Sequence, residues 1–167
     1  MIEQYFNPAQ QEVNLINARD TVVVGGRGIG KSILHATFNL RNMQRMPGSD
    51  GGFVSANTKR CLTNTQVEGG LDIDEAKFIN FEQLKDETFP ANRGNVNLFG
   101  QHYYHHGMLI TSDMPVTKKG SWFLNYKKDC DQQLIDAISS LVVEEYDIRN
   151  RIKTSGHISL YAKRRLK

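Results

Sequence analysis

The sequence predicts a three-layer α/β fold, in which a mostly parallel sheet lies between helices on both of its faces. Three consecutive valines at residues 22–24 predict a strand buried on both faces. A glycine-rich stretch follows, and apolar residues at three-to-four spacing then predict a helix. The other expected strands are short apolar segments that end in polar residues, at 52–57, 71–73 and 108–110.

Size and composition are those of one soluble globular domain, with 167 residues, 39% hydrophobic and 23% charged. The net charge of +3 permits contact with nucleic acid but does not by itself indicate it. No apolar run approaches the roughly 20 residues of a membrane helix, and no signal-peptide core begins the chain, so we expect no membrane partner. The two cysteines, Cys61 and Cys130, make no disulfide framework, which favours a reduced, cytoplasmic setting.

The glycine-rich stretch fits the phosphate-binding P-loop pattern G-x-x-x-x-G-K-[ST]. Glycines allow backbone N–H groups to surround an anion, and the following helix adds the positive end of its dipole. Lys31 is expected to reach the β- and γ-phosphates, and the Ser32 hydroxyl to bind Mg²⁺. The expected phosphate-binding residues are Gly25, Gly26, Arg27, Gly28, Ile29, Gly30, Lys31 and Ser32.

A short helix is expected before the first strand, with Asn7 as its cap and Pro8 at its first position. A glutamine on such a helix, Gln10 or Gln11, is able to pair with the N6 and N7 edge of adenine. The alternative is a surface glutamine with no ligand.

Two adjacent acids, Asp74 and Glu75, end the apolar segment at 71–73. At the end of a strand beside the P-loop strand, Asp74 would hold the magnesium ion and Glu75 would polarise the attacking water as general base. Acid pairs are also common on surfaces, but the upstream P-loop favours the catalytic interpretation. Thr111 and Ser112, at the tip of the next strand, would sense the γ-phosphate or its water, or form an ordinary turn.

The remaining segments are predicted from periodicity. A helix is expected over 81–89, with Phe81, Leu84 and Phe89 facing inward. Trp122 and Phe123 are expected in the core. The alternative for the basic and aromatic loop that contains them is contact with single-stranded nucleic acid. The stripe expected to face the core on the helix after the P-loop is Ile33, Ala36, Leu40 and Met43. Asp131 is expected to cap a long helix, whose apolar side is Leu134, Ile138, Leu141, Val142 and Ile148.

The order of these motifs resembles the ATPase domain of phage terminase large subunits, the motors that package DNA into capsids. Four stretches carry the resemblance: the adenine-side segment at 8–12, the arginine-containing Walker A loop at 25–32, the Walker B aspartate with the catalytic glutamate at 73–76, and the coupling motif at 110–115. The resemblance implies an ASCE-type P-loop NTPase that uses ATP and Mg²⁺, and it favours the γ-phosphate interpretation of Thr111 and Ser112. Arg27, or an arginine from a neighbouring subunit, would offset transition-state charge.

The same resemblance implies the partners and the setting. They are double-stranded DNA, other copies in a ring, the portal and the small terminase subunit, in the cytoplasm of an infected bacterial host. Residues 1–150 would form the ATPase domain, and the basic residues in 151–167 a solvated tail or the start of a further domain. With no acidic cluster for two-metal cleavage, we expect no nuclease activity.

Two departures from the family pattern keep alternatives open. The interval between Lys31 and Asp74 is short, and Gly69 and Gly70 replace part of the apolar run expected before the Walker B acid. A truncated remnant that binds nucleotide or DNA without turnover is one alternative. Another P-loop NTPase, such as a helicase-like protein or a small-molecule kinase, is the other.

Overall fold

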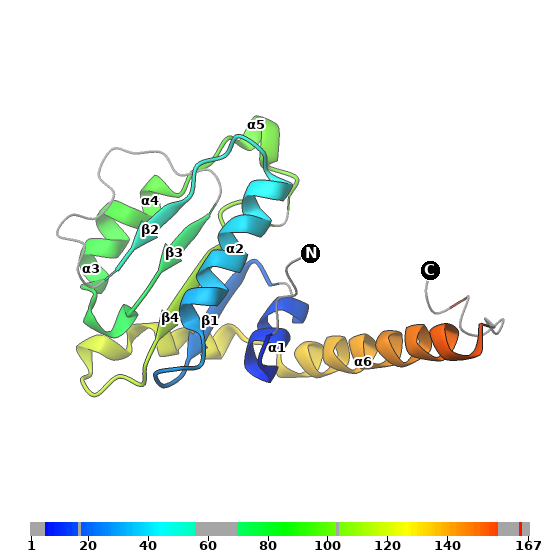
Figure 1. Cartoon of the computed structure of the whole chain (residues 1–167). Coiled ribbons are helices and arrows are strands. Elements are labelled where there is room, and N and C mark those ends of the chain that lie inside the picture. Colours follow the sequence, from blue (N-terminus) through cyan, green and yellow to red (C-terminus); the bar gives the residue numbers. More distant parts are fainter. Residues whose placement is uncertain (1–5, 17, 56–69, 103, 157–163, 165–167) are drawn as a thin grey trace.

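A computed structural model describes residues 6–16, 18–55, 70–102, 104–156 and 164, and in these residues the fold is α/β. Residues 151–155 of the expected tail at 151–167 belong to a helix that begins at Gln132, and of the rest only Gly156 and Arg164 are described. The centre is a four-stranded parallel sheet (Figure 1), with strands β1 (Asp20–Val24), β2 (Gly52–Val54), β3 (Leu71–Ile73) and β4 (Met108–Ser112).

The strand order is β1-β4-β3-β2, so β4 lies between β1 and β3. The expectation that the strand before Asp74 lies directly beside the strand before the glycine-rich loop is therefore wrong. Two ladders hold β4 in place, with Val24 opposite Ser112 and Ile73 opposite Ile110. Because of this order, the residues that follow β4 lie between the glycine-rich loop and Asp74.

Helices cover both faces of the sheet and complete the three layers (Figure 1). The helices before and after β1 are α1 (Pro8–Ile16) and α2 (Lys31–Arg45). Those after β3 are the 3-10 turn η1 (Ala76–Phe78), α3 (Phe81–Gln83), the π-helical η2 (Leu84–Thr88), α4 (Phe89–Ala91) and α5 (Val96–Phe99). After β4 come the 3-10 segment η3 (Lys119–Asp129) and α6 (Gln132–Ser155).

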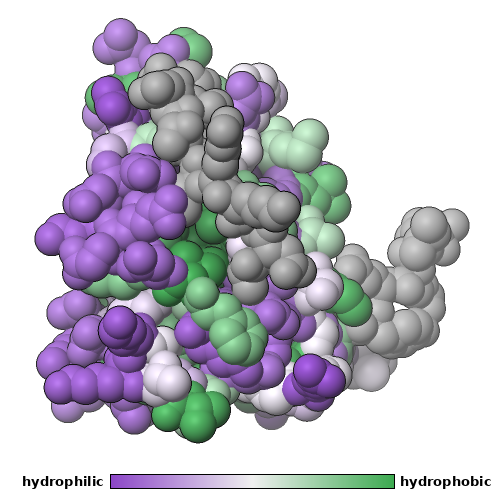
Figure 2. Space-filling view, turned by 90° about the vertical axis from the view of Figure 1, so that its left-hand side faces the viewer, coloured by the Kyte–Doolittle hydropathy of each residue, from purple (hydrophilic) through white to green (hydrophobic). Residues whose placement is uncertain are grey.

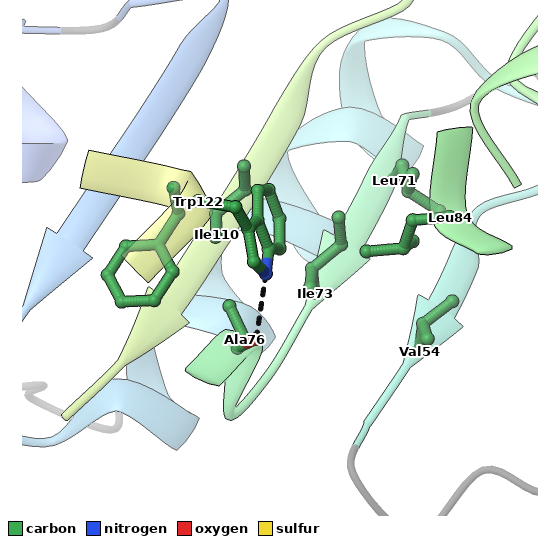
Figure 3. Packing of buried hydrophobic residues seen from close by; sticks show 8 residues of the cluster. Val54, Leu71, Ile73, Ala76, Leu84, Ile110 and Trp122 are labelled. Carbon is green, nitrogen blue, oxygen red and sulfur yellow. Dashed lines mark hydrogen bonds between the residues drawn. The ribbon is translucent and has the colours of Figure 1, made fainter. Parts of the chain in front are cut away.

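Side chains alternate between the two faces along each strand, as the period of a strand requires. Val22 and Val24 pack on the side of Trp122, whereas Val23 packs on the side of α2. The larger core lies on the first side (Figure 3) and contains Val54, Leu71, Ile73, Ala76, Leu84, Ile110, Trp122 and Phe123. The expected burial of Trp122 and Phe123 is confirmed.

The expected helix over 81–89 is confirmed as the continuous run α3, η2 and α4, and Leu84 is fully buried. Two expected caps are also confirmed. Asn7 Oδ1 accepts the Gln10 N–H at 2.9 Å at the start of α1, and Asp131 Oδ1 accepts the Leu134 N–H at 3.0 Å at the start of α6. Local capping chemistry therefore fixes where both helices begin.

The stripe expected to face the core on α2 is wrong. Ile33, Leu40 and Met43 are exposed, and the helix instead buries Leu34, His35, Phe38 and Asn42. Two of the four buried side chains are polar. His35 is tolerated because the sheet beneath α2 offers it polar partners, as described below.

Helix α6 contacts α1 and extends away from the sheet (Figure 1). Its 24 residues include no buried side chain, and Leu134 and Leu141 on the expected apolar side are 56% and 54% exposed. Among the described residues, none of the helices combines the length and the apolar character needed to cross a membrane. The face shown in Figure 2 is largely hydrophilic, with apolar surface near its centre.

Candidate functional site

The candidate site lies where β1, β4 and β3 end, at the same edge of the parallel sheet. The glycine-rich loop of residues 25–30 follows β1, Asp113 follows β4, and Asp74 follows β3. Gly25 N–H donates to the Ser112 carbonyl at 3.0 Å, which joins the beginning of the loop to the end of β4. Ligands of open parallel sheets bind at this edge, and the structure brings the predicted residues Lys31, Asp74, Thr111 and Ser112 together here.

The glycine-rich loop needs its glycines at two positions. Gly28 and Gly30 have φ values of +86° and +80°, in the left-handed region that other residues rarely adopt. Gly30 is the N-terminal boundary residue of α2, so the first turn of the helix begins directly at the loop. At the tip, Gly26, Arg27 and Gly28 are exposed. The loop therefore depends on backbone conformations that favour glycine, and its tip is open to solvent.

Gln10 holds this loop from the side of α1. Its Nε2 donates to the Gly30 carbonyl at 3.1 Å, its Oε1 accepts the Asn7 N–H at 2.9 Å, and the side chain is buried. Asn7 adds a second link, from Nδ2 to the Ile29 carbonyl at 2.9 Å. The Gln10 amide thus supports the loop, and a contact with adenine would require it to leave these partners. Gln11 is exposed and donates to the Phe6 carbonyl at 3.0 Å.

Lys31 lies across the loop and binds a carboxylate. Its Nζ donates to the carbonyls of Gly25 at 2.7 Å and Gly26 at 3.2 Å, and to Asp113 Oδ1 at 2.5 Å. The other Asp113 oxygen accepts from Lys77 Nζ at 3.1 Å. The hydrogen bond from Lys31, and then that from Lys77, lowers the pKa of Asp113 below its usual value. One carboxylate therefore bridges two ammonium groups at the mouth of the site.

Asp74 is oriented by a chain of polar contacts that continues beneath α2. Its Oδ1 accepts from the Thr111 hydroxyl at 2.7 Å and from the Glu75 N–H at 2.9 Å. His35 Nε2 lies 2.8 Å from Thr111 Oγ1. Since the hydroxyl proton goes to Asp74, Nε2 of His35 is the donor to Thr111. Asp74 Oδ2 receives no hydrogen bond from the described residues, which leaves this oxygen open to a cation.

The chain of contacts ends at Asp72, in the middle of β3. His35 Nδ1 lies 3.5 Å from Asp72 Oδ2, and Asn39 Nδ2 donates to the same oxygen. Both Asp72 and His35 are buried. Burial is the largest effect on Asp72 and raises the pKa of its carboxyl, although His35 and Asn39 act in the opposite direction. Asp72, His35, Thr111 and Asp74 thus form one connected polar network between α2 and the sheet.

Glu75 has a strained backbone and an open side chain. Its φ of +52° lies in the left-handed region, which is unusual outside glycine and often found at functional sites. The turn that follows is fixed from the core, because Trp122 Nε1 donates to the Ala76 carbonyl at 3.1 Å (Figure 3). The Glu75 side chain is exposed and makes no hydrogen bond or ion pair with the described residues, so solvent water reaches its carboxylate.

Arg27 and Ser32 have the same open character. Both are exposed, and neither side chain has a polar partner among the described residues. Ser32 and Asp74 offer hydroxyl and carboxylate oxygens, the hard ligands that Mg²⁺ prefers, and magnesium at a phosphate site uses only one or two protein carboxylates. The described residues contain no cluster of three or more His, Cys, Asp or Glu side chains arranged for a metal. Ser32 and Asp74 are thus donors of the type that magnesium takes beside a phosphate.

Sequence reasoning did not select four residues of this site: His35, Asp72, Lys77 and Asp113. One signal for Asp72 was present, because a carboxylate between Leu71 and Ile73 in a buried strand requires partners. The class that fold and site define is a parallel α/β protein with a glycine-rich loop and carboxylates at one edge of its sheet. Comparisons of the chain with protein families, curated proteins and solved structures found no match.

Proposed function

We propose that the chain is a P-loop ATPase and, by its resemblance to terminase large subunits, a motor domain that drives the packaging of double-stranded viral DNA. One observation carries the ATPase proposal. The glycine-rich loop with Lys31 at its end faces Asp74 and Glu75 across the end of a single intervening strand. Phosphoryl transfer needs positioning and charge stabilisation more than covalent chemistry, and these groups supply both.

Each residue has a role in this proposal. The loop N–H groups and Lys31 bind the phosphates, which requires Lys31 to leave Asp113. Ser32 and Asp74 would hold magnesium, whose charge would offset that of the phosphates. Glu75 polarises the attacking water from its open position.

Thr111 and Ser112 act at the same end of β4. Thr111 fixes the Asp74 carboxylate through its hydroxyl, and Ser112 accepts the Lys77 N–H at its Oγ at 3.1 Å. As the coupling motif, this end of β4 would move during hydrolysis and transmit that movement to DNA. Arg27 is open at the loop tip, where its guanidinium can offset transition-state charge.

The geometry favours a working enzyme over a remnant that binds without turnover. The short interval after Lys31 still leaves Asp74 hydrogen-bonded to Thr111, with Oδ2 open and Glu75 beside it. A remnant would have no need to keep this arrangement. The DNA, ring, portal and small-subunit partners, and the host cytoplasm, rest on the resemblance alone.

The test is steady-state ATP hydrolysis by the purified chain, with and without duplex DNA. Glu75→Gln should keep nucleotide binding and lose about 100- to 10,000-fold in turnover, because it removes a general base without removing a phosphate ligand. Lys31→Ala should lose binding and turnover together. Lys85→Ala, which removes an exposed lysine of η2, is the matched control and should behave as the unmodified chain.

The outcomes separate the candidate functions. Stimulation of turnover by duplex DNA supports the motor. Nucleotide binding without turnover, lost only in Lys31→Ala, would support the remnant, and the absence of nucleotide binding would contradict the ATPase and any remnant that binds nucleotide.

A further inference from the structure

Lys77 has no role in the proposed function, yet it reaches the mouth of the site. It lies in η1, two residues after Glu75, and its Nζ is 3.1 Å from Asp113 Oδ2, while Lys31 Nζ is 2.5 Å from Asp113 Oδ1. We infer that Lys77 is a second phosphate-binding residue of this site, specific for the γ-phosphate of a nucleoside triphosphate, and that Asp113 occupies the position of that phosphate before nucleotide binds. This inference rests on the proposed ATPase function.

Chemical similarity supports the exchange of one anion for the other. A carboxylate and a phosphate both present two oxygens to cationic donors, and the same side chains recognise both groups. Two lysines around one carboxylate leave an excess of positive charge. The γ-phosphate carries more negative charge than Asp113, so it would satisfy the two ammonium groups better.

The backbone of Lys77 is held in place before any ligand arrives. Its N–H donates to Ser112 Oγ at 3.1 Å, and the preceding Ala76 carbonyl accepts from Trp122 Nε1. Gly120 packs so closely that an added Cβ would lie 2.6 Å from the Lys77 carbonyl oxygen. The side chain is 18% exposed, compared with 14% for Lys31. Pre-organisation of this kind favours a residue that acts on a ligand.

The two lysines should differ in which phosphate they recognise. Lys31 follows the glycine-rich loop and is expected to contact both the β- and the γ-phosphate. Lys77 approaches from the side of Glu75, where the water attacks, and would therefore contact the γ-phosphate alone. A diphosphate lacks this group, so Lys77 should distinguish ATP from ADP and should also stabilise charge as the phosphoryl group is transferred.

The experiment measures equilibrium binding of ADP and of a non-hydrolysable ATP analogue, both with Mg²⁺, to the full chain. Lys77→Met keeps the apolar stem of the side chain and removes its charge. It should weaken binding of the analogue by about tenfold or more, the loss expected for one charge-assisted contact, and leave ADP binding unchanged. Lys77→Arg should restore the preference for the analogue, and Lys118→Met is the exposed control.

A second variant tests the role of Asp113. Asp113→Asn removes the competing charge, so it should bind the analogue more tightly than the unmodified chain. If Asp113 instead bound magnesium, Asp113→Asn would bind the analogue more weakly. That result would overturn the inference that Asp113 occupies the position of the γ-phosphate.

The remaining outcomes distinguish the inference from the function on which it rests. If the unmodified chain binds both nucleotides and Lys77→Met binds them equally well, the inference about Lys77 is wrong and the ATPase proposal stands. If Lys77→Met loses both nucleotides to the same extent, Lys77 only supports η1, and the inference fails. If the unmodified chain binds neither nucleotide, the inference and the proposed function fail together.

Discussion

Gln10 and Gly30 are joined by a hydrogen bond of 3.1 Å, from the side-chain Nε2 of one to the carbonyl oxygen of the other. The bond connects α1 to the last residue of the glycine-rich loop. An added Cβ on Gly30 would collide with the Gln10 amide. The Gln10 side chain therefore fits only because residue 30 is glycine. The loop is thus held from outside the P-loop pattern itself.

Gln10→Ala should destabilise the protein by about 1–3 kcal/mol, because it removes a buried side chain together with its hydrogen bonds to the half-buried Asn7 N–H and Gly30 carbonyl. Urea unfolding measures the change. Gln11→Ala is the matched control on the same helix, and its exposed side chain predicts an effect within about 0.5 kcal/mol. Equal effects of the two variants would contradict a loop-holding role for Gln10.

Gly30→Ala should cost more than Gly48→Ala, although the two glycines have nearly the same φ, +80° and +82°. Both variants pay a backbone strain of about 1–3 kcal/mol. Only Gly30→Ala also produces a clash with the Gln10 amide, because a Cβ at Gly48 has no atom within 4 Å among the described residues. Thermal unfolding of the two variants isolates the cost of the contact, and identical losses would show that Gln10 moves aside freely.

Thr111→Val should weaken the apparent affinity for Mg²⁺ in ATP turnover and so raise the half-saturating magnesium concentration about tenfold or more. The hydroxyl that orients Asp74 and accepts from His35 is removed while the shape is kept. Thr37→Val, whose hydroxyl donates to the Ile33 carbonyl elsewhere on α2, is the control. An unchanged magnesium requirement would mean that Thr111 does not position the carboxylate.

Asp113→Asn should change the pH dependence of stability. The pKa of Asp113 is lowered in the folded protein by Lys31 and then Lys77, so the ion pair stabilises the fold above the usual value of 3.8. This contribution is lost as pH falls through the lowered folded pKa. Urea unfolding between pH 2 and pH 7 should therefore show a difference between the two proteins that is constant above pH 5 and disappears in acid. A difference independent of pH would contradict the ion pair.

Local patterns were sufficient to predict the elements around the glycine-rich loop. The valine run, the loop and the caps at Asn7 and Asp131 are set by neighbours within a few residues, and they appear where expected. The buried face of α2 could not be predicted in this way. Hydropathy favoured Ile33 and Leu40, but His35 is buried because Asp72 and Thr111 meet it from the sheet.

The order of the strands is the second feature that the sequence did not reveal. The placement of β4 between β1 and β3 depends on pairing between distant segments, which leaves no local pattern. It is this placement that brings Asp113 to Lys31, residues far apart in the sequence. The glycine-rich loop and the acid pair were therefore predictable as motifs, whereas Lys77, His35 and Asp113 become visible only once the sheet is assembled.

Helix α6 has a mechanical consequence. Its 24 residues form a rod about 36 Å long that rests against α1 near one end. A tilt of about 10° at α1 would swing the far end by about 6 Å, given this length. Since Gln10 ties α1 to the loop, a small rotation of the loop and α1 together would be enlarged along α6, and the far end of α6 would move most.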